Sequence, residues 1–188
     1  HVVVAAHKGG VVRAFQGERL VANDTGLVAR AGRERWVTHQ VDPGADVWLE
    51  EGGITVAGRF QRAPRLLPSP VRQVLFRLVN ATLGRVAPDL LRRLLQRLLI
   101  TGKRPAPVRF ERRIAWGASG LEIRDRLEAR PGDVRRLDRL WAASDATSIY
   151  VATSNLWQSA ALLAWEPLDE AAAELRRRGR AEIRRLLP

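Results

Sequence analysis

The stretch from residue 108 to residue 127 limits the fold of this chain most, because its hydrophobicity alternates with a period of two. One register of the first half contains Val108, Phe110, Arg112, Ile114 and Trp116. After a turn signal at 117–120, the return half alternates through Leu121, Ile123, Asp125 and Leu127. This pattern predicts a β-hairpin with one face toward a core. Trp116 shares the register of Phe110 and Ile114, which predicts a core position, whereas Arg112 indicates either a face of mixed polarity or a bulge.

Short apolar segments separated by turn residues occupy most of the remaining chain, which has strong turn signals such as Asp42-Pro43-Gly44. Strands are predicted at 2–6, 11–15, 19–22, 27–31, 36–41, 46–50, 54–60, 134–141, 149–151 and 160–165. Residues 169–178 predict a short helix that ends at Gly179, and 181–187 fit either a helix or a final edge strand. We therefore expect a mainly β fold, an antiparallel β-sandwich or large sheet with a short C-terminal helix.

Residues 69–101 interrupt the β pattern with helical periodicity. Ser69 is a suitable N-cap, Pro70 suits the first helical position, and Gly84 divides the segment into two halves. We expect an inserted α-helical hairpin with an apolar stripe and a basic surface, formed by Leu90, Leu94, Leu98, Arg92, Arg93 and Arg97. Such a hairpin can lie on an anionic membrane or pack its leucines on the sheet. Packing is favoured because most amphipathic helices in globular chains are half-buried.

The composition favours one folded domain over residues 1–188. The hydrophobic share is 46%, and no apolar run is long enough to span a bilayer. Without cysteine there is no disulfide and no cysteine-ligated zinc. The net charge of +12 comes almost wholly from arginine. It suggests polyanionic partners, although a coding preference for arginine explains it equally well. The chain lacks methionine and begins with His1, so we expect it to start inside a longer polypeptide.

Three segments together suggest a family. The strings KGGVVRAF…ERLVANDTGLVAR, ITVAGRFQRAP and FERRIAW…GLEIRDRLE resemble the C-terminal β-sandwich region of heparinase II/III-like proteins. In that family an (α/α) toroid precedes the sandwich, and the enzymes are carbon–oxygen lyases of uronic-acid-containing polysaccharides. The resemblance implies an anionic polysaccharide or the missing toroid as partner, and a periplasmic, extracellular or membrane-associated location. Much of the catalytic machinery of the family lies in the toroid, so this chain is not expected to be a complete enzyme.

Few residues suggest chemistry of their own. His7, beside the turn Lys8-Gly9-Gly10, and Tyr150, the only tyrosine, are the candidate catalytic groups, although a plain turn and a packed ring explain them as well. His39 is predicted to lie on a solvated face. His7, Asp24 and His39 form an allowed zinc ligand set, but nothing in their spacing requires them to converge. No other cofactor is predicted.

The arginines and tryptophans suggest binding. Five arginines fall on the predicted hairpin and form the candidate polyanion site: Arg109, Arg112, Arg113, Arg124 and Arg126. Guanidinium groups pair with carboxylate or sulfate, and sugar rings stack on indoles. The sequence thus favours a module that handles an anionic polysaccharide. The alternative is a membrane-surface or protein-interaction module that uses residues 70–100, and nucleic-acid binding ranks last because it rests on net charge.

Overall fold

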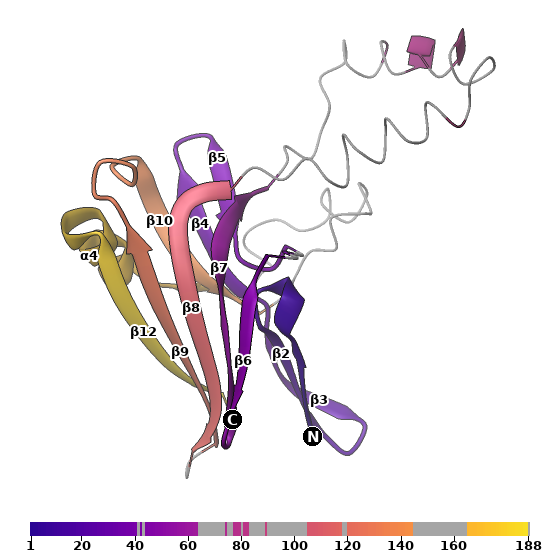
Figure 1. Ribbon diagram of the computed structural model, residues 1–188, viewed down its shortest axis with the longest axis vertical. Helices are drawn as coiled ribbons and strands as arrows, with labels where there is room; N and C mark the ends of the chain where they lie inside the picture. Colours follow the sequence, from indigo (N-terminus) through magenta and orange to yellow (C-terminus); the bar gives the residue numbers. More distant parts are fainter. Residues whose placement is uncertain are drawn as a thin grey trace.

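The computed structural model describes residues 1–40, 42, 44–63, 74, 77–79, 81–82, 89, 105–117, 120–144 and 165–187. Two antiparallel sheets dominate it, which confirms the predicted mainly β fold (Figure 1). The smaller sheet has the order β1-β2-β3, formed by Val2–Ala5, Val11–Gln16 and Arg19–Asp24. A 3-10 turn, η1 (Ala6–Lys8), joins β1 to β2 and ends at the glycine pair that the sequence marks as a turn.

The larger sheet has nine strands in the order β11-β10-β4-β5-β7-β8-β9-β12, with β6 paired to β7. Its strands are β4 (Gly26–Ala31), β5 (Glu34–Val37), β6 (Asp46–Glu50), β7 (Gly53–Arg62), β8 (Pro105–Gly117), β9 (Gly120–Ala129), β10 (Leu137–Ala143), β11 (Glu166–Pro167) and β12 (Arg180–Leu187). The hairpin β8–β9 is paired without a register shift from Val108 to Gly117, so Arg112 sits on a mixed face rather than at a bulge.

Helix α4 (Asp169–Arg178) joins the two ends of the large sheet. It contacts β10 near one end of the strand order and β12 at the other. The sheet therefore curls around α4, which packs on the inner face of the sheet (Figure 1). Acidic residues in its first turn and arginines in its last complement the helix dipole. Gly179 ends it in the left-handed conformation, with its N–H on the carbonyl of Leu175 at 2.9 Å. The predicted helix is confirmed, and the ambiguous residues after it form the edge strand β12.

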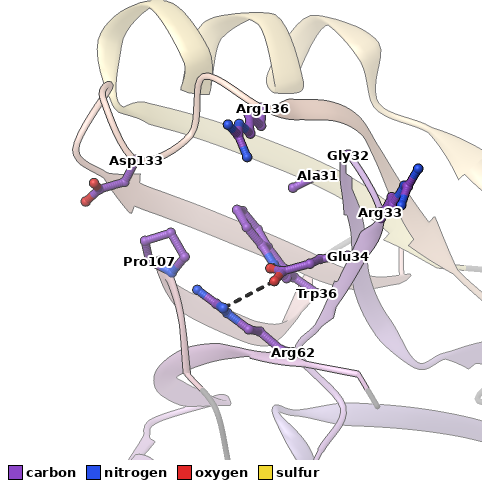
Figure 2. A pocket seen from close by; sticks show the side chains of 9 residues that line it. All are labelled: Ala31, Gly32, Arg33, Glu34, Trp36, Arg62, Pro107, Asp133 and Arg136. Carbon is purple, nitrogen blue, oxygen red and sulfur yellow. Dashed lines mark hydrogen bonds and ion pairs between the residues drawn. The ribbon is translucent and has the colours of Figure 1, made fainter. Parts of the chain in front are cut away.

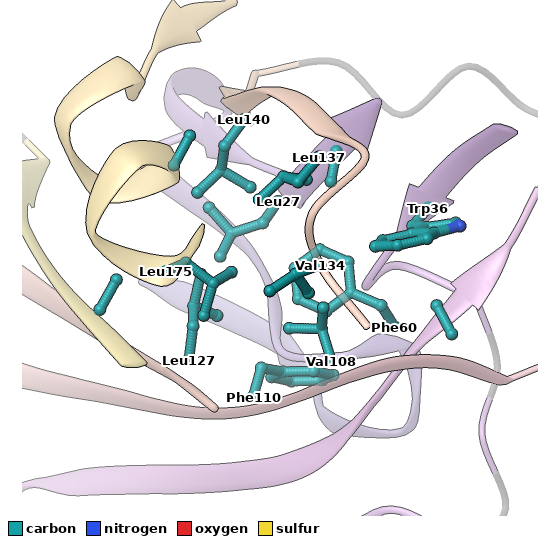
Figure 3. Packing of buried hydrophobic residues seen from close by; sticks show 14 of the residues in the cluster. Leu27, Trp36, Phe60, Val108, Phe110, Leu127, Val134, Leu137, Leu140 and Leu175 are labelled. Atoms are coloured by element: carbon teal, nitrogen blue, oxygen red, sulfur yellow. The ribbon is translucent and has the colours of Figure 1, made fainter. Parts of the chain in front are cut away.

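The main core lies inside the curl. Figure 3 shows side chains from β4, β7, β8, β9, β10 and α4 meeting there, including Leu27, Phe60, Phe110, Leu140 and Leu175. Phe60 and Phe110 pack edge to face, with ring centroids 6.0 Å apart. Trp36 is also buried in this core.

A second cluster covers the inner face of the hairpin. Val12 from the small sheet packs against Ile114, Leu121 and Ile123 of β8 and β9. Trp116 continues the same register but is 63% exposed, so its predicted core position is wrong. It lies one residue from the end of β8, beyond the side chains that cover the rest of that face.

The bounds of β5 and β10 are shifted along the chain from the predicted strands 36–41 and 134–141. β5 ends at Val37, where the Thr38 hydroxyl accepts the N–H of Leu27, and β10 starts at Leu137 because residues 131–136 form a turn. The predicted strand 149–151 and residues 160–164 of the predicted strand 160–165 lie outside the described residues, and Trp165 is not in a strand.

The insertion is described at only a few positions. Those at 74, 77–79, 81–82 and 89 are helical, as the hairpin prediction requires. Its predicted membrane or partner face lies outside the described residues: Leu90, Leu94, Leu98, Arg92, Arg93 and Arg97. In the part of the chain that is described, no helix is long and apolar enough to cross a membrane. The single-domain organisation of 1–188 stays a prediction.

Candidate functional site

Arg112, predicted to bind a polyanion, is instead fully buried beneath the small sheet, with an exposed fraction of 0%. Its Nε and Nη2 donate to the two carboxylate oxygens of Asp125 at 2.6 and 2.9 Å. Its Nη1 donates to Asp24 Oδ1 at 2.6 Å and to the Gly10 carbonyl at 3.3 Å. A guanidinium held on both sides in this way offers no donor to a surface ligand.

Arg185 from β12 completes a buried quartet of two arginines and two aspartates. It donates to Asp24 Oδ2 and, at 3.1 Å, to Asp125 Oδ2. Burial alone would raise the pKa of Asp24, but Arg112 and Arg185 outweigh it and hold that pKa below its ordinary value. All four side chains of the quartet are therefore ionised, and their two positive and two negative charges cancel. Since Asp24 ends β3 and the other three lie on β8, β9 and β12, the quartet ties the small sheet to the large one.

Two glycines make room for this quartet. A Cβ on Gly10 would lie 2.9 Å from Cδ of Arg112, and one on Gly26 would collide with the Thr38 hydroxyl. Both residues have a positive φ, 72° and 103°, which L side chains rarely adopt. The glycine turn beside His7 thus lets the backbone approach the chain's own arginine.

The candidate zinc ligands do not form a site. Asp24 is occupied by two arginines, and His7 is exposed on η1. His39 is partly buried, which corrects its predicted solvated position. Burial together with Arg35 and Arg112 lowers its pKa to about 4. Among the described residues no three His, Cys, Asp or Glu side chains are grouped to hold a metal ion. Tyr150, the other candidate catalytic residue, lies outside the described part of the chain.

Three of the predicted arginines do come together on the outer face of the large sheet. Arg113, Arg124 and Arg126 line a shallow groove of about 380 Å³, which we call the outer groove. Its other lining residues are Trp48, Glu50, Thr55 and Glu111. Arg109 lies on the same outer face, exposed and paired in register with Glu128, but does not line the groove.

Strand register explains the arrangement of the outer groove. Trp48 of β6 is opposite Thr55 of β7, and Thr55 is opposite Arg113 of β8. Arg113 is opposite Arg124 of β9, which in turn is opposite Arg184 of β12. One row across five strands therefore starts with an indole and ends with three guanidinium groups. Neighbouring strands are about 4.8 Å apart, so this row presents its cations at short, regular intervals.

Glutamates hold these like charges together. Arg113 pairs with Glu50 at 3.0 Å, and Glu122 pairs with both Arg124 and Arg184, the latter at 2.9 Å. The hydrogen bonds from Arg124 and Arg184 lower the pKa of Glu122. Arg126 lies 3.7 Å from Glu111 and 3.9 Å from Glu182. Cations directly opposite each other repel, and the glutamates offset that repulsion while leaving the arginines about half exposed.

Trp48 and Arg184 lie outside the predicted set of five hairpin arginines. Trp48 is 48% exposed and Arg184 is exposed at the sheet edge. The alternation within 46–50 and 180–187 puts each on one face of a strand, but only the strand order places them beside β8 and β9.

Comparison with known proteins adds no relative: no family model matches this chain, and neither a curated protein nor a solved structure is similar to it. The resemblance to heparinase II/III-like proteins therefore stays a prediction.

Proposed function

We propose that this chain is a β-sheet module that binds an acidic polysaccharide through the outer groove, as part of a larger heparinase II/III-like protein. The observation that carries the proposal is the row from Trp48 to Arg184, which puts an exposed indole in line with three guanidinium groups. An acidic polysaccharide combines rings that have apolar faces with carboxylates or sulfates. Both kinds of group therefore find a partner in the same row.

The composition of the groove favours binding over catalysis. Its described lining consists of arginines, glutamates, one threonine and one tryptophan, and includes neither of the candidate catalytic residues His7 and Tyr150. The glutamates that separate the arginines would repel a densely charged phosphate backbone, which argues against nucleic acid. The same glutamates would repel less strongly a polymer whose charges are spaced along sugar rings.

The test compares polymers that differ in charge, using calorimetric titration. Native protein is expected to bind polygalacturonate but not neutral dextran, with an affinity that falls as salt is raised. Trp48→Ala and Arg124→Gln should each weaken binding by about tenfold. Arg177→Gln is the matched control, because Arg177 is exposed on α4, which packs on the inner face of the sheet, opposite to the outer groove. Equal binding to dextran, or an equal loss in the control, would contradict the proposal.

A second candidate is docking on an anionic membrane through the insertion. One observation favours it: Val74 and Leu78, one helical turn apart, are both 58% exposed. Co-sedimentation with vesicles that contain phosphatidylserine tests it, with neutral vesicles as control. If the insertion docks, Leu78→Glu abolishes sedimentation and leaves polysaccharide binding unchanged. Sedimentation that survives this substitution would remove the candidate.

A further inference from the structure

A second cavity, of about 850 Å³, lies where β7 ends and β8 begins (Figure 2). We call it the rim pocket. It is lined by Ala31, Gly32, Arg33, Glu34, Trp36, Arg62, Pro107, Asp133 and Arg136. It shares no lining residue with the outer groove. Its volume is within the range of about 300–1,000 Å³ typical of pockets for small ligands.

One wall of the rim pocket is held by Glu34. Its Oε2 accepts the indole N–H of Trp36 at 3.0 Å, and its Oε1 accepts Nη1 of Arg62 at 3.2 Å. Trp36 is buried in the main core, so this chain of contacts fixes the guanidinium of Arg62 against a rigid base. Arg62 is itself 42% exposed and keeps further donors for a ligand.

The opposite wall is the turn at 131–136. It is closed by hydrogen bonds from the N–H of Asp133 to the Arg130 carbonyl and from Leu137 to Val134, both 2.9 Å. Val134 is fully buried and anchors the turn in the core. Figure 2 shows Arg136 descending from this turn toward the indole of Trp36, with Arg62 on the other side of the ring.

The charges of the rim pocket are not balanced. Three arginines face two carboxylates, Glu34 and Asp133. Among the described residues, Arg136 makes no ion pair or hydrogen bond, so its charge is not neutralised within this part of the chain. Arg136 is thus an exposed cation on a wall that is already fixed, and Glu34 holds a second guanidinium, that of Arg62, in the same pocket. Such an arrangement is suited to binding an oxyanion.

We propose that the rim pocket binds a small hydroxylated organic anion, whose carboxylate or sulfate pairs with Arg136 while Arg62 adds positive potential from the opposite wall. The exposed carboxylate of Asp133 accepts hydrogen bonds from hydroxyl groups of the ligand, while Pro107, Ala31 and the edge of Trp36 provide an apolar wall. A ligand of one ring with one acidic group matches the single excess positive charge and fits within the volume with room to spare. This site is independent of the outer groove and would exist whether or not that groove binds polymer.

The test uses sodium glucuronate as probe, with methyl glucoside as its uncharged counterpart and sodium sulfate as the bare oxyanion. Binding is followed by the indole N–H resonance of Trp36, assigned by comparison with Trp36→Phe. We expect glucuronate and sulfate to shift this resonance and methyl glucoside to leave it in place. Arg136→Gln should weaken glucuronate binding about tenfold or more, because one charge-assisted hydrogen bond is lost at an exposed position.

Arg113→Gln, in the outer groove, is the control and should leave glucuronate affinity unchanged. Full affinity in Arg136→Gln, a shift with methyl glucoside equal to that with glucuronate, or no shift at millimolar glucuronate would each overturn the proposal. A loss confined to Arg113→Gln would assign the small anion to the outer groove instead. Failure of the polymer titrations alone would leave this result unaffected, so the two proposals are tested separately.

Discussion

Replacing Arg112 by methionine tests the buried quartet directly. The substitution keeps an unbranched side chain of similar length but removes four hydrogen bonds, to Asp125, Asp24 and the Gly10 carbonyl. Two buried carboxylates then share only Arg185. Breaking a buried pair in this way costs roughly 3–5 kcal/mol of unfolding free energy. For a chain of this length that corresponds to a fall of about 6–20 °C in Tm.

The loss should depend on pH. In the native protein the lowered pKa of Asp24 stabilises the fold above the ordinary aspartate value of 3.8, and this stability is lost as pH falls below it. In Arg112→Met one of the two opposing cations is gone and Arg185 remains, so burial shifts the pKa of Asp24 upward from its native value. The folded variant therefore takes up a proton at Asp24 at a higher pH than folded native protein does. The difference in stability between the two proteins should therefore narrow as pH falls.

Urea unfolding at several pH values measures both effects. The double variant Arg112→Met with Asp125→Leu restores neutrality, leaving Arg185 paired with Asp24, and should be more stable than either single variant. The single variant Asp125→Leu completes the double-mutant cycle. Losses that simply add in the double variant, or a gap to native protein that is the same at all pH values, would refute the charge-balance reasoning.

Three further predictions concern packing and titration. Leu175→Ala, in the contact of α4 with the core, should cost about 2–5 kcal/mol by chemical unfolding, and a loss below 1 kcal/mol would show that α4 is dispensable. Gly26→Ala should cost roughly 1–3 kcal/mol in the same assay, because its φ is positive and a Cβ would strike Thr38. His39 should titrate by NMR with a midpoint near 4 instead of 6.5, so its contribution to stability declines as pH falls through that interval; a midpoint near 6.5 would contradict its burial.

Sequence patterns within short segments predicted most of the secondary structure correctly. Helix α4 has the predicted bounds, because the signals that define it lie within the segment itself: charged ends, an apolar face and a terminal glycine. The hairpin β8–β9 follows from strict alternation, which also places Arg113, Arg124 and Arg126 together on one face. The same alternation misplaced Trp116, because register assigns a side chain to a face but not to the covered part of that face.

The candidate site depended on pairings between distant segments. Arg112 interrupts an apolar register, a signal visible in the sequence, but its partner Asp24 is 88 positions away and Arg185 reaches that aspartate across 161. In the outer groove, Trp48 joins the arginines only because β6 pairs with β7 and β7 lies next to β8 in the sheet. Periodicity along the chain determines which face of a strand a residue occupies, whereas strand order and the approach of the small sheet determine its neighbours. The sequence alone therefore predicted strands, turns and the arginines of one hairpin, and long-range packing decided which arginine became structural and which remained available to a ligand.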